Sequence, residues 1–229
     1  MQLKAQDMNY FTPDFLEFFK ELAANNHKDW FDINRKRYAN EVKEPFKKLV
    51  GDLINEIKSK HEPELLIEPK DAIFRINRDI RFAKDKTPYK TNLSALLSPR
   101  GRKNHAYSSF YFELGPERIA IFGGCYGPSS QELASMRQHL LSNYSRFDKL
   151  RKDKSFISHF PKGIEGEKQK RVPKEFKEWV EKDDVFLNKQ FYYGAELDAD
   201  IIPTGKLFQT LMKYYALAHP MMNFLREPF

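Results

Sequence analysis

The sequence predicts an α+β protein with N-terminal helices, a central, largely antiparallel sheet and C-terminal helices. Apolar residues recur at helical spacing before residue 60, short or alternating apolar runs fill residues 72–123, and a helical pattern returns after residue 204. We find no internal repeat, low-complexity linker or sharp composition change. We therefore expect a single domain over residues 1–229, with a less regular C-terminal subdomain from about residue 143 as the alternative division.

The N-terminal part of the chain predicts two helices. In Thr12–Asp14, the threonine can cap a helix, the proline suits its first position and the aspartate suits its dipole. Asn25-Asn26 should end this helix. A second apolar stripe runs from Lys28 to Ile57 and predicts a second helix. Pro45 should kink or restart it, because proline lacks the backbone N–H that a helix interior requires.

Short strands are expected in the middle of the chain. Ala72–Ile76 and Asn92–Leu97 are short and apolar. Phe and Leu alternate with Tyr and Ser through Tyr107–Leu114, a Gly115-Pro116 turn follows, and Arg118–Gly123 is again apolar. The two runs on either side of this turn predict an antiparallel hairpin.

The C-terminal half is predicted to be mainly helical. Ser129–Glu132 has the spacing of a capping box and should open a helix. Asn143–Val172 is less regular, Phe176–Val180 fits a short helix, and Phe186–Tyr193 fits a strand. Thr204–Ala218 carries the apolar stripe of a final helix.

The composition excludes several classes of protein. Of the 229 residues, 39 are Lys or Arg and 32 are Asp or Glu, giving a net charge of +7 that permits anionic partners without requiring them. The lone Cys125 excludes a disulfide framework, and the six histidines form no closely spaced pair, so we expect no metal site. Met1–Asp7 lacks a secretion pattern and no apolar run approaches a membrane span. We therefore expect a soluble, cytoplasmic protein that does not engage membranes.

One segment stands out by its charge. Residues 73–92 read IFRINRDIRFAKDKTPYKTN, with six basic and two acidic side chains between Arg75 and Lys90. The local net charge of 6 − 2 = +4 is more than half the excess of the whole chain. Apolar and aromatic residues interleave with the charges, which indicates a folded surface rather than a mobile tail.

This segment is the candidate binding site for an anionic ligand that bears phosphate or carboxylate. Arginine forks suit such groups, and lysine acts as a point charge. Asn34 and Arg35, which follow a second polar cluster beginning at Asn25, are a candidate second wall near a helix N-terminus. The predicted ligand-binding residues are Arg75, Arg78, Arg81, Lys84, Lys86, Tyr89, Lys90, Asn34 and Arg35.

Three other interpretations stay open. The protein can be an enzyme acting on a small anionic substrate, with Lys86, Tyr89 and Asp85 as candidate proton-transfer groups. It can bind nucleic acid through the same cations. It can also be a scaffold in which Asp79 and Asp85 brace the basic side chains. The sequence identifies no cofactor, reaction or oligomeric state.

The chain resembles a family of conserved hypothetical proteins, domain of unknown function 2461. The resemblance is carried by Phe11-Thr-Pro13, Asn25-Asn26 and Trp30-Phe31, and more strongly by the motif residues between Ile73 and Lys90. Gly123-Gly124 and the following helix with Arg137 add to it. The resemblance implies an α+β protein without an assigned activity, and it supplies no catalytic residues.

Overall fold

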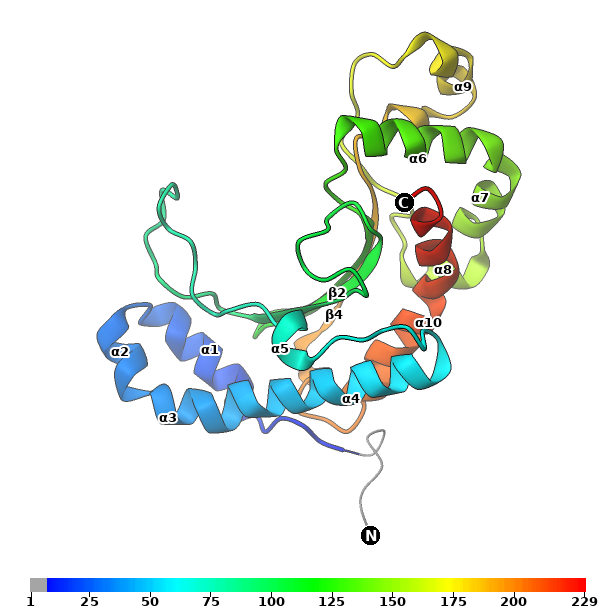
Figure 1. Ribbon diagram of the computed structural model, residues 1–229. Helices are drawn as coiled ribbons and strands as arrows, with labels where there is room; N and C mark the ends of the chain where they lie inside the picture. Colours follow the sequence, from blue (N-terminus) through cyan, green and yellow to red (C-terminus); the bar gives the residue numbers. More distant parts are fainter. Residues whose placement is uncertain (1–7) are drawn as a thin grey trace. The chain divides into compact units, whose positions relative to one another are not determined.

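The computed structural model describes residues 8–229, and Met1–Asp7, where the sequence lacks a secretion pattern, lie outside this range (Figure 1). Helices at both ends of the chain flank a central four-stranded antiparallel sheet, which confirms the predicted α+β class. The strands are hydrogen-bonded in the order of the sequence. They are β1 (Leu93–Leu97), β2 (Ser109–Leu114), β3 (Arg118–Cys125) and β4 (Phe191–Asp198).

The N-terminal helices are α1 (Asp14–Ala24), α2 (Lys28–Ile33), α3 (Arg35–Arg37), a π-helix (Tyr38–Lys43), α4 (Glu44–Lys60) and α5 (Pro69–Ala72). The second predicted helix is therefore interrupted at Asn34 and rewound as a π-helix before Pro45. Pro45 lies in the first turn of α4, so the predicted restart is confirmed. Helices α4 and α5 both pack on β1.

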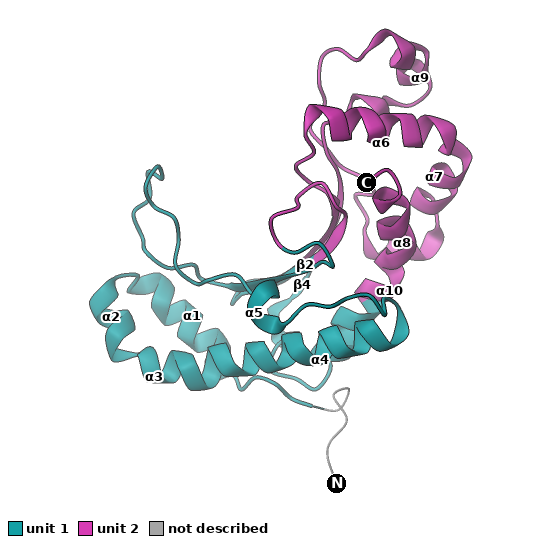
Figure 2. Ribbon diagram, viewed as in Figure 1, with its two compact units in different colours: residues 1–101, 111–120, 196–213 teal, residues 102–110, 121–195, 214–229 magenta. Residues whose placement is uncertain are grey.

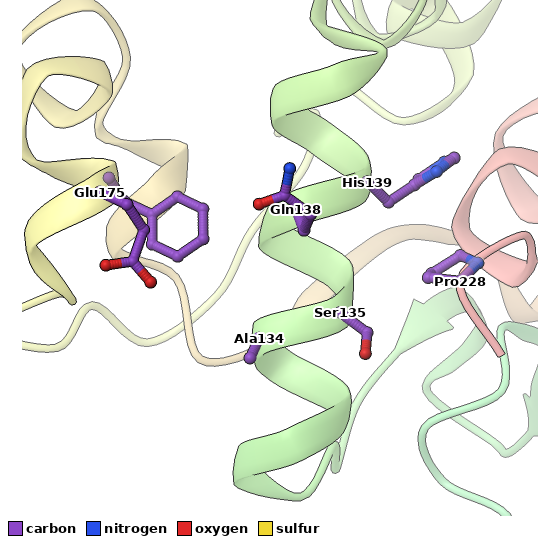
Figure 3. Close-up of a pocket in the computed structure, with 7 residues that line it drawn as sticks. Ala134, Ser135, Gln138, His139, Glu175 and Pro228 are labelled. Carbon is purple, nitrogen blue, oxygen red and sulfur yellow. The ribbon is translucent and has the colours of Figure 1, made fainter.

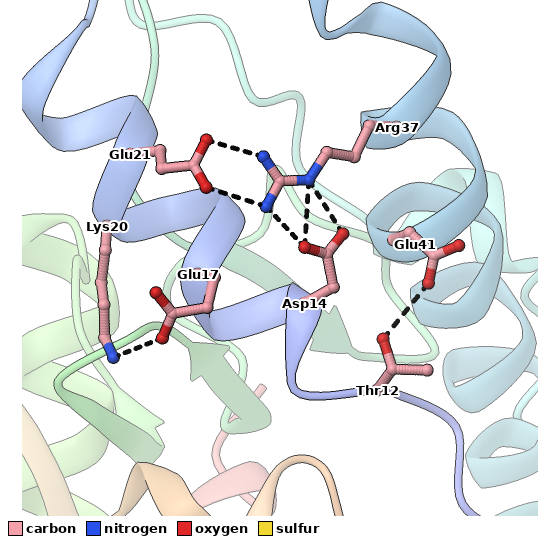
Figure 4. A network of polar contacts seen from close by, with 7 residues as sticks. All are labelled: Thr12, Asp14, Glu17, Lys20, Glu21, Arg37 and Glu41. Carbon is pink, nitrogen blue, oxygen red and sulfur yellow. Dashed lines mark hydrogen bonds and ion pairs between the residues drawn. The ribbon is translucent and has the colours of Figure 1, made fainter.

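The expected role of Thr12 as a helix cap is wrong. Pro13 occupies the capping position of α1 without a side-chain cap, and the Thr12 hydroxyl donates instead to the Glu41 carboxylate at 3.2 Å. The start of α1 is held from outside the helix, by Arg37 of α3 (Figure 4). Its guanidinium donates to Asp14 at 2.9 Å from Nε and to Glu21 at 2.7 Å from Nη1. This fork fixes α1 against α3.

The later helices are α6 (Ser130–Ser142), α7 (Tyr144–Arg151), α8 (Lys154–His159), α9 (Lys177–Lys182) and α10 (Leu207–Arg226), with 3-10 turns at Lys174–Phe176, Asp184–Leu187 and Ala199–Ile201. The capping box at Ser129 and Glu132 is confirmed. The predicted strand Phe186–Tyr193 is shifted: Phe186 belongs to a 3-10 turn, and β4 begins only at Phe191. No helix within residues 8–229 is long and apolar enough to cross a membrane.

The chain divides into two compact units (Figure 2). Unit 1 comprises residues 1–101, 111–120 and 196–213, and unit 2 comprises residues 102–110, 121–195 and 214–229. In unit 1, Phe112 of β2 packs on Phe46 of α4 with ring centroids 5.8 Å apart. In unit 2, the fully buried Tyr193 packs edge-on against Phe156 and Phe160. The prediction of a single domain stays a prediction.

Unit 2 contains a buried cation. Arg137 of α6 is only 4% exposed and donates from Nε to the Phe186 carbonyl and from Nη2 to the Asn188 carbonyl, each at 2.9 Å. Burial lowers the pKa of this guanidinium below its ordinary value. Arg137 therefore holds the turn before β4 against α6 through backbone carbonyls rather than through a carboxylate.

We expect Arg137→Ala to lower the free energy of unfolding by roughly 2–4 kcal/mol, because two buried carbonyls lose a charged donor. Urea denaturation followed by circular dichroism measures this change. Arg137→Met separates the lost hydrogen bonds from the lost volume, and Gln138→Ala at the exposed neighbouring position is the control. An Arg137→Ala variant as stable as Gln138→Ala would contradict this account.

Candidate functional site

The basic segment predicted from the sequence folds as an irregular β-hairpin that leads into β1 (Figure 1). Antiparallel bridges pair Ile73 with Ala95 and Asn77 with Tyr89. Between these two bridges the first strand advances four residues and the second advances six. The second strand therefore carries two extra residues, which form a bulge near the base of the hairpin.

Asn26 and Phe31 anchor the hairpin to the helices of unit 1. The Asn26 side-chain amide donates to the Tyr89 carbonyl at 2.9 Å, and its oxygen accepts from the Tyr89 N–H at 3.1 Å. The Tyr89 ring stacks on Phe31 of α2 with centroids 4.1 Å apart and is only 7% exposed. Burial raises the pKa of the Tyr89 hydroxyl, and the Asp32 carboxylate adds to this effect.

Two of the predicted arginines pair with acids of the same segment. Arg78 donates to Asp85 and to the hydroxyl and carbonyl of Thr87. Arg81 grips Asp79 with two hydrogen bonds, 3.0 Å from Nε and 2.7 Å from Nη2. The N–H of Thr87 and the Arg78 guanidinium lower the pKa of Asp85 to about 2, so this carboxylate stays charged near neutral pH.

Three more candidates are also engaged locally. The Lys86 ammonium donates to the Ile80 carbonyl at 2.9 Å. Arg35 pairs with Asp32, three residues earlier in the chain. The Asn34 amide donates to the Trp30 carbonyl at 3.0 Å, within its own helix end. The structure thus brings neither Asn34 nor Arg35 into a hydrogen bond with the hairpin.

Arg75, Lys84 and Lys90 are the predicted cations that form no hydrogen bond or ion pair with the residues described. Arg75 and Lys84 are exposed, whereas Lys90 is half-buried. The Lys90 ammonium lies 5.4 Å from the centroid of the Phe74 ring, a cation–π contact. Arg75 and Lys90 lie near the base of the hairpin, and Lys84 lies at its tip.

Lys90 lies near two polar side chains of β2, those of Tyr111 and Glu113. Phe112 of that strand is buried against α4, and alternation along the strand places Tyr111 and Glu113 on the opposite, half-buried face. The Tyr111 hydroxyl donates to Glu113, and its ring meets the Phe74 ring edge-on at 5.9 Å. This face of unit 1 therefore carries an amine, a carboxylate and a phenol close together.

The environment of Lys90 perturbs its ionisation. Burial lowers the pKa of Lys90 below its ordinary value; the Glu113 carboxylate raises it, and the Arg75 guanidinium lowers it further. Burial also raises the pKa of Tyr111, together with its hydrogen bond to Glu113. Arg75 and Lys90 therefore repel each other, and the Glu113 carboxylate is the acid that attracts Lys90.

Sequence reasoning missed Phe74, Tyr111 and Glu113 as parts of this cluster. Its signal was present in part, because the alternation along Tyr107–Leu114 already separated Tyr111 from the buried Phe residues. The pairing of residues 73–74 with β1 was not predictable from the sequence. This pairing brings Phe74 and Lys90 beside β2.

Other features of the molecule lie apart from the predicted residues. In unit 2, a hollow of about 490 Å³ is lined by Ala134, Ser135, Gln138, His139, Glu175, Phe176 and Pro228 (Figure 3). Cys125 is buried, and burial raises the pKa of its thiol to about 12. Across residues 8–229, no three His, Cys, Asp or Glu side chains gather as a metal site would require.

The chain belongs to the family described as "Conserved hypothetical protein (DUF2461)", whose model matches residues 14–224. The family assignment from the sequence motif is thereby confirmed. No curated protein and no solved structure shows a significant match to the chain.

We expect Asn26→Ala to lower the free energy of unfolding by about 1–3 kcal/mol, because the N–H and carbonyl of Tyr89 lose their partner. Amide hydrogen exchange at Tyr89 should accelerate. Asn26→Asp keeps only the hydrogen-bond acceptor, so its free energy of unfolding should lie between those of Asn26→Ala and the unmodified protein. Lys28→Ala, at an exposed position, is the control. Unchanged exchange at Tyr89 would refute the anchoring role of Asn26.

Opposite shifts in the pKa of Lys90 are expected from its two charged neighbours. Glu113→Gln should lower the pKa further, and Arg75→Gln should raise it, because the first removes an attraction and the second a repulsion. Side-chain NMR titration of the lysines measures both shifts, with exposed Lys58 as the internal control. Shifts of the same sign in the two variants would contradict the described arrangement.

Proposed function

We propose that this member of the DUF2461 family binds an anionic ligand, bearing phosphate or carboxylate, at the face formed by Arg75 and Lys90. One observation carries the proposal: these two neighbouring cations have no ion pair among the described residues, whereas Arg78, Arg81 and Arg35 each pair with an acid. We also propose that the protein works in the cytoplasm, without membrane partners.

The energetic argument rests on Lys90. A half-buried ammonium without an ion-pair partner is costly, and its lowered pKa reflects that cost. An anion bound beside Lys90 would supply an acceptor for the ammonium and would offset its repulsion by Arg75. Binding should therefore raise the pKa of Lys90.

A second candidate is an enzyme acting on a small anionic substrate, and the lowered pKa of Lys90 beside Glu113 is the observation that favours it. Lys90 replaces Lys86 as the proposed proton-transfer group, because the Lys86 ammonium is bonded to the Ile80 carbonyl. Lys90→Arg distinguishes the two functions. Arginine keeps the charge needed for binding, but it stays protonated and cannot transfer a proton near neutral pH.

We expect the double variant Arg75→Gln/Lys90→Gln to bind anions at least about tenfold more weakly, since two charged hydrogen-bond donors are lost. Isothermal titration calorimetry with inorganic phosphate, pyrophosphate and succinate measures the change. The matched control is Lys36→Gln/Lys58→Gln, which removes the same charge from exposed positions of unit 1. If both doubles lose equal affinity, only net charge matters and the site is wrong. If the protein binds none of the three anions, the proposal fails for these ligand classes.

A further inference from the structure

The tip of the hairpin, residues 78–87, is a braced loop that presents one aromatic ring to solvent. Phe82 is 95% exposed, the largest exposed fraction among the large apolar side chains described. A single exposed apolar residue is ordinary on a protein surface. The surroundings of Phe82 are less usual, because nearly all the polar side chains near it in the loop form ion pairs or hydrogen bonds with other residues of the same loop.

The bracing comes from ion pairs and hydrogen bonds within the loop. Arg81 grips Asp79, Arg78 bonds Asp85 and Thr87, and Lys86 donates to the Ile80 carbonyl. Asp85 additionally accepts from the Thr87 N–H at 2.9 Å. These bonds link most of the polar side chains of the loop to one another. Phe82 and Lys84 are left facing solvent.

The charge of the tip specifies the partner. Four basic and two acidic side chains lie between Arg78 and Lys86, so the net charge is 4 − 2 = +2. The carboxylates of Asp79 and Asp85 are neutralised by Arg81 and Arg78. An anionic partner with a flat apolar surface for Phe82 would match the charge and the exposed ring of this tip.

We propose that the tip binds single-stranded nucleic acid, with a base stacked on Phe82 and a neighbouring phosphate on Lys84. Unpaired bases stack on exposed aromatic rings, and basic side chains follow the phosphates of the same strand. Bases in a duplex are already stacked, and opening a step costs more than one phenyl ring recovers. An anionic membrane fits less well, because one phenyl ring inserts little apolar area and two carboxylates flank it.

This inference rests on the proposed function, since it identifies the anion as a nucleic-acid phosphate. Arg75 and Lys90 lie on the same hairpin as Phe82. Phe82 lies six positions after Ile76, whose carbonyl accepts from the Lys90 N–H, and six extended residues span no more than about 20 Å. One strand can therefore reach the tip and the Arg75–Lys90 face together. Arg75 and Lys90 would contact phosphates, and Phe82 at the tip would add a contact with a nucleobase.

The test is fluorescence anisotropy with short fluorescein-labelled DNA and RNA oligonucleotides of mixed sequence, each as a single strand and as a duplex. Phe82→Ala should weaken single-strand binding about tenfold, Phe82→Trp should preserve it, and Phe82→Leu should behave as Phe82→Ala. Lys84→Gln should reduce the slope of log affinity against log salt by about 0.7, the contribution of one phosphate on a single strand. Comparing the DNA and RNA arms identifies the natural polymer.

Ile33→Ala is the matched control, because Ile33 is 83% exposed in unit 1 and basic residues follow it at positions 35–37. Equal affinities of Phe82→Ala and the unmodified protein would overturn the inference. So would equal binding by Phe82→Leu and Phe82→Trp, or Phe82-dependent binding to phosphatidylserine vesicles without oligonucleotide binding. A different result separates the two proposals. If Arg75→Gln/Lys90→Gln lowers the affinity for pyrophosphate while Phe82→Ala leaves oligonucleotide binding unchanged, the proposed function stands and only the stacking role of Phe82 fails.

Discussion

The two hydrogen bonds between the Asn26 amide and the backbone of Tyr89 determine where the candidate site lies. They join a residue after α1 to a residue 63 positions later in the chain. Stacking of Tyr89 on Phe31 supports the same junction, and the Arg37 fork holds the helices that carry it. With Tyr89 fixed, the next residue is directed to the opposite side of the strand, where Phe74 and β2 lie. The ring that the sequence presented as a ligand contact is, in the structure, an anchor.

Charge pairing then decides which cations are available to a ligand. Asp79 and Asp85 each form an ion pair with an arginine of their own loop, and Asp79 also attracts Arg75 at the base of the hairpin. Exposed pairs of this kind contribute little to stability. The scaffold hypothesis expects this bracing by Asp79 and Asp85, but the paired side chains are largely exposed and leave the Phe82 ring in solvent. The base of the hairpin is different, because Lys90 is partly desolvated beside a second cation.

Patterns with a short range were predictable, whereas long-range pairing was not. Alternation and a Gly-Pro turn located the hairpin of β2 and β3, and the capping box located α6. The interruption of the second helix by a π-helix had no local signal, since its apolar stripe continues through it. For the site, the sequence identified the charged segment but not its register, and the two extra residues of the bulge change which side chains meet β2. Glu113 could be assigned to the site only once that register was known.

The division of the chain has a consequence for attempts to dissect the protein. Three strands and α10 each contribute residues to both units, and neither unit is a continuous stretch of sequence. A single cut anywhere in the chain therefore cannot release one unit whole. A cut between β1 and β2, or between β3 and β4, would leave strands without a neighbour, and exposed strand edges favour aggregation. Proteolysis and truncation are consequently poor routes to the hairpin's function, and point variants of the full-length chain are the tools that leave its anchoring intact.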